Sequence, residues 1–189
     1  MSNIAIFASG SGTNAENIMR YFSTRPGAKV SLVLSNRHDA MVLKRAETHN
    51  VETMFFDRDD FYVSGKVLAE LRKHRIDLVV LAGFLWLVPS SIIEEYAGRI
   101  INIHPALLPK YGGKGMYGDR VHKAVIDAGE KTSGITIHYV NGVYDAGDII
   151  FQAECSVTPD DTPATLASKV HALEYRYFPE VIENLLSKL

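Results

Sequence analysis

Short apolar runs rich in β-branched residues alternate with helical patterns almost from end to end, and this alternation restricts the fold more than any other feature. Five runs are typical of buried strands: residues 4–8, 30–34, 53–56, 78–82 and 100–103. Between the third and fourth runs, one helix face is indicated by four apolar residues at helical spacing: Val63, Val67, Leu68 and Leu71. The alternation predicts an α/β fold, with an open, twisted, mostly parallel Rossmann-like sheet that carries helices on both faces.

The pattern changes in the second half of the chain. Residues 105–119 contain two prolines and four glycines and predict a long loop, which a short helix over residues 121–128 follows. Residues 133–140 and 149–157 then predict two further strands that are joined by a turn and are antiparallel.

The tail over residues 165–186 has a helical pattern, and Pro179 is expected to interrupt it or to start a second helix. No internal repeat, low-complexity stretch or interdomain linker divides the sequence. A length of 189 residues suits one large domain, so a single domain over residues 1–189 is the simplest expectation.

Composition and charge exclude several classes of protein. The net charge is −2 and Lys and Arg form no dense cluster, which disfavours nucleic acid as the main ligand. No apolar run is long enough to span a membrane, and the N-terminus does not resemble a secretory signal. Cys155 is the only cysteine and cannot form an internal disulfide, so a cytoplasmic location is expected.

A glycine-rich segment follows the first predicted strand and precedes a helical stretch. Gly10, Gly12 and Ala15 match the G-x-G-x-x-G/A pattern, in which glycines bring backbone N–H groups and a helix N-terminus close to a phosphate. The second strand ends in Ser35–Arg37 instead of the acidic residue that an unmodified NAD ribose requires. The segment therefore predicts phosphate binding and leaves two ligands open: an NADP-like dinucleotide with its 2′-phosphate on Arg37, or a monophosphate substrate.

Two polar side chains end the fifth predicted strand. Asn102 and His104 are two residues apart, so they share one face, and Pro105 keeps His104 extended. Ligands of open α/β sheets bind at the carboxyl ends of the strands. An amide that stabilises an oxyanion beside an imidazole that moves protons suits acyl transfer. The same side chains could instead only satisfy backbone groups of the next loop, and the residues alone leave both interpretations open.

The segment Asn102–Pro109, with the sequence NIHPALLP, resembles the signature of the folate-dependent formyltransferase family. Further matching blocks follow the family order and span nearly the whole chain: Gly10–Asn14, Val79–Phe84, Thr136–His138, Asp145–Ile150 and Glu174. The resemblance implies a one-carbon transferase that uses 10-formyltetrahydrofolate as co-substrate and needs no metal. Within the family, the chain is most similar to the branch that formylates the amine of 5′-phosphoribosylglycinamide in de novo purine biosynthesis.

The resemblance assigns the chemistry to three residues: Asn102, His104 and Asp145. Asp145 is then the partner of the imidazole, and its charge is expected to raise the pKa of His104. The residues alone do not distinguish Asp145 from Asp148 in the same turn. Thr136 and His138 share one strand face, so both are expected to line the site.

The resemblance also implies two binding regions. The phosphate and the glycinamide end of the acceptor are bound by Gly12, Thr13, Asn14 and Glu174. The folate is bound by Leu85, Trp86, Leu87, Val88, Val140, Asn141, Gly142, Val143 and Tyr144. The chain is thus expected to have an N-terminal phosphate-binding half, residues 1–100, and a C-terminal catalytic and folate-binding half, residues 101–189.

Glu174 borders the apolar face of the predicted last helix, which Val170, Leu173 and Tyr177 mark. A carboxylate in that position needs a partner. A substrate amine would serve, and so would an ion pair with a neighbouring Arg or Lys.

The chain departs from the family pattern at residues 112–118, which form a longer loop, and at Trp86, where many relatives carry Arg. Formyltetrahydrofolate hydrolase shares the catalytic set and is the alternative within the family. From a different class, the alternative is an NADP-binding oxidoreductase. All three functions imply small-molecule partners, and the sequence is compatible with a monomer or a homodimer.

Overall fold

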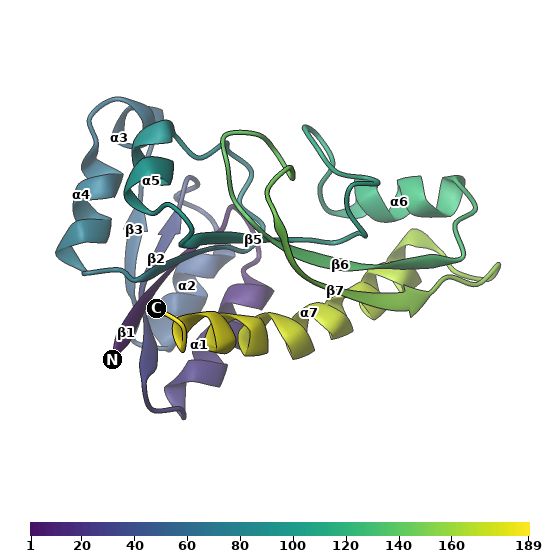
Figure 1. The fold of residues 1–189 in the computed structure, drawn as a ribbon, viewed down its shortest axis with the longest axis horizontal. Coiled ribbons are helices and arrows are strands. Elements are labelled where there is room, and N and C mark those ends of the chain that lie inside the picture. Colours follow the sequence, from purple (N-terminus) through teal and green to yellow (C-terminus); the bar gives the residue numbers. More distant parts are fainter.

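A computed structural model describes residues 1–189 and contains one sheet of seven strands in the order β3-β2-β1-β4-β5-β6-β7 (Figure 1). The strands are β1 Ser2–Phe7, β2 Ala28–Ser35, β3 Glu52–Phe55, β4 Leu78–Leu81, β5 Ile100–His104, β6 Thr132–Tyr139 and β7 Ile149–Ser156. Strands β1 to β5 pair in parallel, whereas β6 runs antiparallel to β5 and to β7. The predicted mostly parallel sheet with antiparallel C-terminal strands is confirmed.

Helices cover both faces of this sheet (Figure 1). The helices are α1 Thr13–Ser23, α2 Met41–Thr48, α3 Arg58–Tyr62, α4 Lys66–Lys73, α5 Ser90–Glu95, α6 Asp119–Asp127 and α7 Pro163–Leu186. Helices α1, α2 and α7 pack into one apolar core, and α3, α4 and α5 pack into a second core. No helix is long and apolar enough to cross a membrane.

Strand β1 shows why the central strands have continuous apolar sequences. Ile4 and Ile6 belong to the first core, while Ala5 and Phe7 belong to the second, because successive side chains point to opposite faces of the sheet. Each of the four is at most 1% exposed. A parallel strand that is covered on both faces has no position for a polar residue, so its sequence does not alternate.

The expectation that Pro179 interrupts the last helix is wrong, because α7 is one continuous helix from Pro163 to Leu186. Pro179 has no N–H group and therefore leaves the carbonyl of Tyr175, four residues earlier, without its helical donor. The side chain of Asn17 on α1 donates a hydrogen bond of 2.8 Å to this carbonyl. A contact between two helices thus replaces the bond that the proline removes.

The prediction that Val63 lies on the apolar face of a helix is also wrong. Val63 lies between α3 and α4 and is 78% exposed, whereas Val67 and Leu71 on α4 are buried in the second core. Helices α2, α3 and α5 are not predicted, since each is short and has few buried residues.

The strand order opens space for a ligand at the carboxyl ends of the central strands. Successive strands are added on one side of β1 up to β3 and then on its other side from β4 onward, so β1 pairs with β2 on one side and with β4 on the other. The loops after β1 and β4 therefore leave the sheet in opposite directions and open a crevice at their carboxyl ends. Strand β5, next to β4, delivers Asn102 and His104 to the same edge.

Candidate active site

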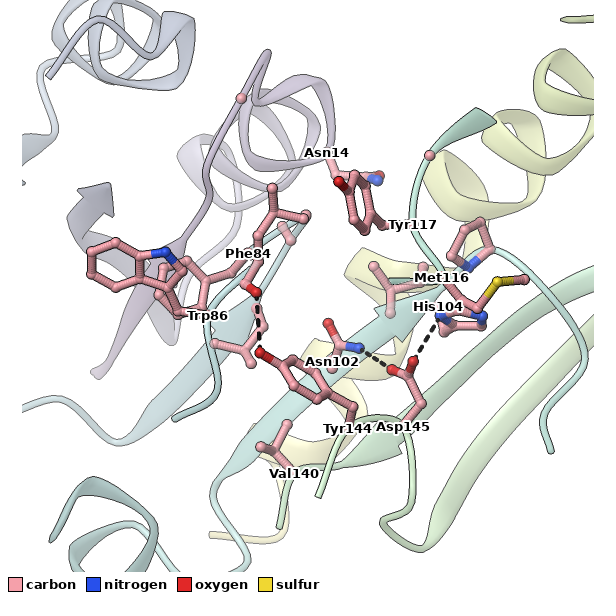
Figure 2. Close-up of a pocket in the computed structure, with 18 of the residues that line it drawn as sticks. Asn14, Phe84, Trp86, Asn102, His104, Met116, Tyr117, Val140, Tyr144 and Asp145 are labelled. Carbon is pink, nitrogen blue, oxygen red and sulfur yellow. Dashed lines mark hydrogen bonds and ion pairs between the residues drawn. The ribbon is translucent and has the colours of Figure 1, made fainter. Parts of the chain in front are cut away.

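A cavity of about 640 Å³ opens at the carboxyl ends of β1, β4 and β5 (Figure 2). Its walls are drawn from segments far apart in the sequence, within residues 10–14, 81–88, 102–105, 113–122 and 138–145, together with two residues of α7. This is the position at which open α/β sheets bind ligands.

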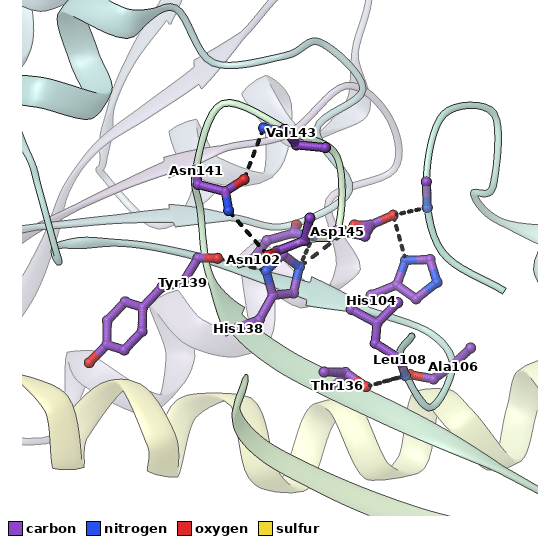
Figure 3. A network of polar contacts seen from close by, with 12 residues as sticks. Asn102, His104, Ala106, Leu108, Thr136, His138, Tyr139, Asn141, Val143 and Asp145 are labelled. Carbon is purple, nitrogen blue, oxygen red and sulfur yellow. Dashed lines mark hydrogen bonds and ion pairs between the residues drawn. The ribbon is translucent and has the colours of Figure 1, made fainter. Parts of the chain in front are cut away.

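Three of the predicted residues meet at the centre of the cavity (Figure 3). The Asp145 carboxylate lies between the other two: Oδ2 is 3.4 Å from His104 Nδ1, and Oδ1 is 3.4 Å from Asn102 Nδ2. The backbone N–H of Gly113 donates a 2.9 Å hydrogen bond to Oδ2 and ties the long loop to this group. Asp148, the rival in the same turn, is exposed and does not line the cavity.

His138 also lines the cavity, as predicted, and it orients Asn102 (Figure 3). Its Nδ1 lies 2.8 Å from the carbonyl of Tyr139 and must carry the proton, because a carbonyl only accepts hydrogen bonds. Its Nε2 then accepts from the Asn102 amide at 3.1 Å. The second amide hydrogen of Asn102 is left with the long Asp145 contact, which a substrate oxygen can replace.

The pKa of His104 is lowered from its ordinary value, because burial of the ring outweighs the opposing effects of Asp145 and the Tyr111 carbonyl. The expectation that Asp145 raises this pKa overall is therefore wrong, and the free protein holds a neutral imidazole near pH 7. Burial alone would raise the pKa of Asp145, but the neighbouring His138 and His104 rings in their protonated forms and the Gly113 N–H lower it, so Asp145 is ionised.

The phosphate-binding end predicted from the sequence faces the same cavity. Gly12, Thr13 and Asn14 form its wall at the N-terminus of α1, where free N–H groups and the helix dipole favour an anion. Two exposed cations of the long loop and α6, Lys114 and Arg120, also line this space. Neither cation is predicted, because the glycine-rich sequence around them indicates only a loop.

Glu174 is 4% exposed and lies on the buried stripe of α7. Its Oε2 accepts hydrogen bonds from Asn14 Nδ2 at 2.8 Å and from His171 Nδ1 at 2.9 Å. Its protein partners are therefore an amide and an imidazole, and neither is the Arg or Lys considered above. His171 and the buried His122 line the cavity beside it, although the sequence pattern around them shows only a helix.

The other end of the cavity is apolar and aromatic (Figure 2). Eight of the nine residues predicted to bind folate line it: Leu85, Trp86, Leu87, Val88, Val140, Asn141, Val143 and Tyr144. Phe84, Met116 and Tyr117 extend the lining of the cavity, and Trp86 stacks with Tyr62 at 6.0 Å between ring centroids. Gly142, the ninth predicted residue, does not line the cavity.

Thr136 is fully buried and does not line the cavity, contrary to its prediction. Its hydroxyl donates to the Ala106 carbonyl at 2.7 Å and accepts from the Leu108 N–H at 3.0 Å (Figure 3). Thr136 therefore holds the segment that follows His104 and has no access to a substrate.

The position of Arg37 does not support an NADP-like dinucleotide in this cavity. Arg37 is paired with Asp39 at 3.3 Å and lies outside the cavity.

Glu52, Glu70 and His74 form a group whose potential metal-ligand atoms lie within 4.8 Å of one another, but none of these residues lines the cavity. In this group, His74 is already 3.0 Å from Glu52, and Glu70 is 2.9 Å from Lys73.

Comparison with known proteins identifies relatives along nearly the whole chain. The family model described as formyl transferase matches residues 2–182. A phosphoribosylglycinamide formyltransferase of Bacillus subtilis is 34% identical over 191 residues, which cover 98% of this chain and 95% of that protein. A chloroplastic protein of the same name from Arabidopsis thaliana is 38% identical over 95% of this chain, which spans 63% of that longer protein.

A solved structure shows the same fold. The crystal structure of phosphoribosylglycinamide formyltransferase from Bacillus halodurans has a TM-score of 0.88 to this chain at 38% identity, covering 99% of this chain and 96% of that one. The family match includes every segment that lines the cavity. The chain belongs to the formyl transferase family.

Proposed function

We propose that this chain transfers the formyl group of 10-formyltetrahydrofolate to the amine of 5′-phosphoribosylglycinamide. One observation carries the proposal: Asn102, His104 and Asp145 converge in one cavity, between a helix N-terminus suited to phosphate and an apolar aromatic wall. The names of the relatives in Bacillus subtilis and Arabidopsis thaliana support this choice of acceptor.

The two ends of the cavity suit the two substrates. The phosphate of the acceptor binds to the N–H groups of Gly12, Thr13 and Asn14, where charge-assisted hydrogen bonds contribute about 1.5–3 kcal/mol each. The flat ring of the folate packs against the aromatic wall, and its polar edge binds backbone groups of residues 85–88 and 140–144. Glu174, which accepts a hydrogen bond from Asn14, binds the glycinamide end of the acceptor.

Asn102 stabilises the oxyanion that forms when the amine attacks the formyl carbon. Asn102 Nδ2, which now lies 3.4 Å from Asp145 Oδ1, donates its second hydrogen to this oxygen, while His138 keeps the amide in place. Loss of one such donor typically costs about 10²–10³ in rate.

His104 moves the proton. A neutral imidazole takes a proton from the attacking nitrogen, and the resulting imidazolium lies beside both the oxyanion and the Asp145 carboxylate. The imidazolium then delivers the proton to N10 of the folate as the carbon–nitrogen bond breaks. The lowered pKa of His104 suits this sequence, because the ring must start neutral to act as a base.

Folate turnover with and without the acceptor amine tests the proposal. Wild-type protein is expected to consume 10-formyltetrahydrofolate only when the amine is present, whereas equal consumption without it would show a hydrolase. His104→Asn is expected to lower kcat about 10²- to 10⁴-fold. Calorimetry is expected to show acceptor binding within about threefold of wild type.

Asp148→Asn serves as the matched control, because Asp148 occupies the same turn as Asp145 but does not line the cavity. It is expected to keep full activity. An equal loss in His104→Asn and Asp148→Asn would contradict the assignment of the site, and so would a His104→Asn variant that loses acceptor binding but not kcat.

A further inference from the structure

The proton on His104 is located by a contact outside the predicted catalytic set. Nε2 of the ring lies 2.8 Å from the backbone carbonyl of Tyr111. A carbonyl only accepts, so Nε2 carries the hydrogen, and in the neutral ring Nδ1 has the free lone pair. Nδ1 lies 3.4 Å from Oδ2 of Asp145, which lines the cavity.

Tyr111, which supplies this carbonyl, is anchored through its side chain to a charged group. Tyr111 has a φ of 58°, in the left-handed region that residues other than glycine rarely occupy. Its hydroxyl donates a 2.9 Å hydrogen bond to Glu130 Oε1, and Lys110 Nζ lies 2.8 Å from the same oxygen. Lys110 and Tyr111 lower the pKa of Glu130, which is therefore ionised and a strong acceptor.

We propose that Tyr111 and Glu130 are positioning residues, which select the Nε2–H tautomer of His104 and so make Nδ1 the nitrogen that accepts the proton. Neither residue lines the cavity, so both act through His104 and not on a substrate. The role in catalysis rests on the proposed function, whereas the tautomer itself does not.

The fixed carbonyl has a defined part in the proton transfer. Nδ1 forms a bond to the proton as the N–H bond of the attacking nitrogen breaks, and the ring becomes an imidazolium with two N–H groups. One of these groups donates to the Tyr111 carbonyl and the other faces Asp145. The Nδ1 proton then passes to N10 as the formyl carbon leaves it, which returns the neutral Nε2–H tautomer.

Nitrogen-15 NMR of the imidazole rings in the free protein measures the tautomer directly, with the His104 signals assigned by their absence in His104→Asn. Wild-type protein is expected to show the Nε2–H pattern. Tyr111→Phe and Glu130→Ala each remove the hydrogen bond that anchors the Tyr111 side chain, and both are expected to mix the two tautomers. Tyr21→Phe is the matched control, since Tyr21 donates to Glu183 at 2.6 Å and both residues lie outside the cavity.

Kinetics supply the second readout. Loss of one hydrogen bond is expected to lower kcat about 3- to 10-fold in Tyr111→Phe and Glu130→Ala, with both KM values within about twofold of wild type. The acid limb of kcat/KM is expected to move to lower pH, because the Tyr111 carbonyl favours protonated His104. Tyr21→Phe is expected to change neither property.

A wild-type His104 in the Nδ1–H tautomer would overturn the proposal. Variants at Tyr111 and Glu130 that keep the wild-type tautomer and the wild-type acid limb of kcat/KM against pH would overturn it as well. This holds whether or not kcat and the melting temperature fall together. The tautomer is measured without substrate, so a wild-type protein that shows Nε2–H but no formyl transfer would refute the proposed function alone.

Discussion

At the scale of the residue, the surroundings of His104 decide its chemistry. A carboxylate beside an imidazole raises the imidazole pKa, and the sequence alone leads to that expectation. Only 4% of the His104 side chain is exposed, however, and the loss of hydration disfavours the charged ring more than Asp145 favours it. The result is a neutral base that gains a stabilising partner only when it takes up a proton.

Asp145→Asn tests this balance through the pH dependence of activity. Wild-type kcat/KM is expected to rise with pH through a pKa below about 6.5, the ordinary value for histidine. Removal of the Asp145 charge lowers the pKa of His104 further, so the acid limb moves to lower pH while the maximal kcat falls about 10²-fold or more. Initial rates across the pH range check this, and an acid limb that moves to higher pH would contradict it.

At the scale of the element, the N-terminus of α1 depends on one glycine. Gly12 has a φ of 73° and is the N-cap of the helix. A Cβ atom at this position would lie 2.4 Å from the Val42 side chain on α2, so the loop and α2 can approach only around a glycine. At Gly10, in the same loop, a Cβ atom would meet nothing within 4 Å.

Gly12→Ala and Gly10→Ala form a matched pair that tests the phosphate site. Gly12→Ala is expected to move the N–H groups of residues 12–14 and to weaken binding of the phosphorylated acceptor about 10- to 100-fold, the equivalent of one charge-assisted hydrogen bond. Gly10→Ala is expected to bind nearly as wild type. Calorimetry with the acceptor measures both, and equal affinities for the two variants would show that the phosphate binds elsewhere.

At the scale of the whole molecule, the site exists only where distant segments meet. Figure 1 shows the loops after β1, β4 and β5 approaching the connection between β6 and β7, while α7 runs along α1 and the last two strands. Both ends of the cavity are built on one continuous sheet. Ligands that fill the two ends are therefore expected to stabilise the folded chain as a unit.

Thermal unfolding measures this stabilisation. The phosphorylated acceptor and an unreactive folate analogue, each at about 100 times its Kd, are each expected to add about 2.7 kcal/mol to the free energy of unfolding. For a chain of this size that corresponds to a rise in Tm of about 5–10 °C per ligand. NADPH is expected to leave Tm unchanged, because Arg37 is paired with Asp39 outside the cavity; an equal rise with NADPH would restore the dinucleotide interpretation.

The order of residues along the chain is enough to predict the parallel sheet, the glycine-rich turn into α1 and the placement of Asn102 and His104 on one face of β5. These features follow from residue spacing along a few consecutive positions, which a strand or a helix start expresses directly. The folded protein was needed to show which aspartate meets His104, that Thr136 holds a loop, and that α7 continues through Pro179. Each of these outcomes depends on atoms that are far apart in the chain, such as the Asn17 side chain that satisfies Tyr175 and the packing that removes water from His104. Hydrogen-bond partners and desolvation are properties of the folded interior, and no local pattern in the sequence contains them.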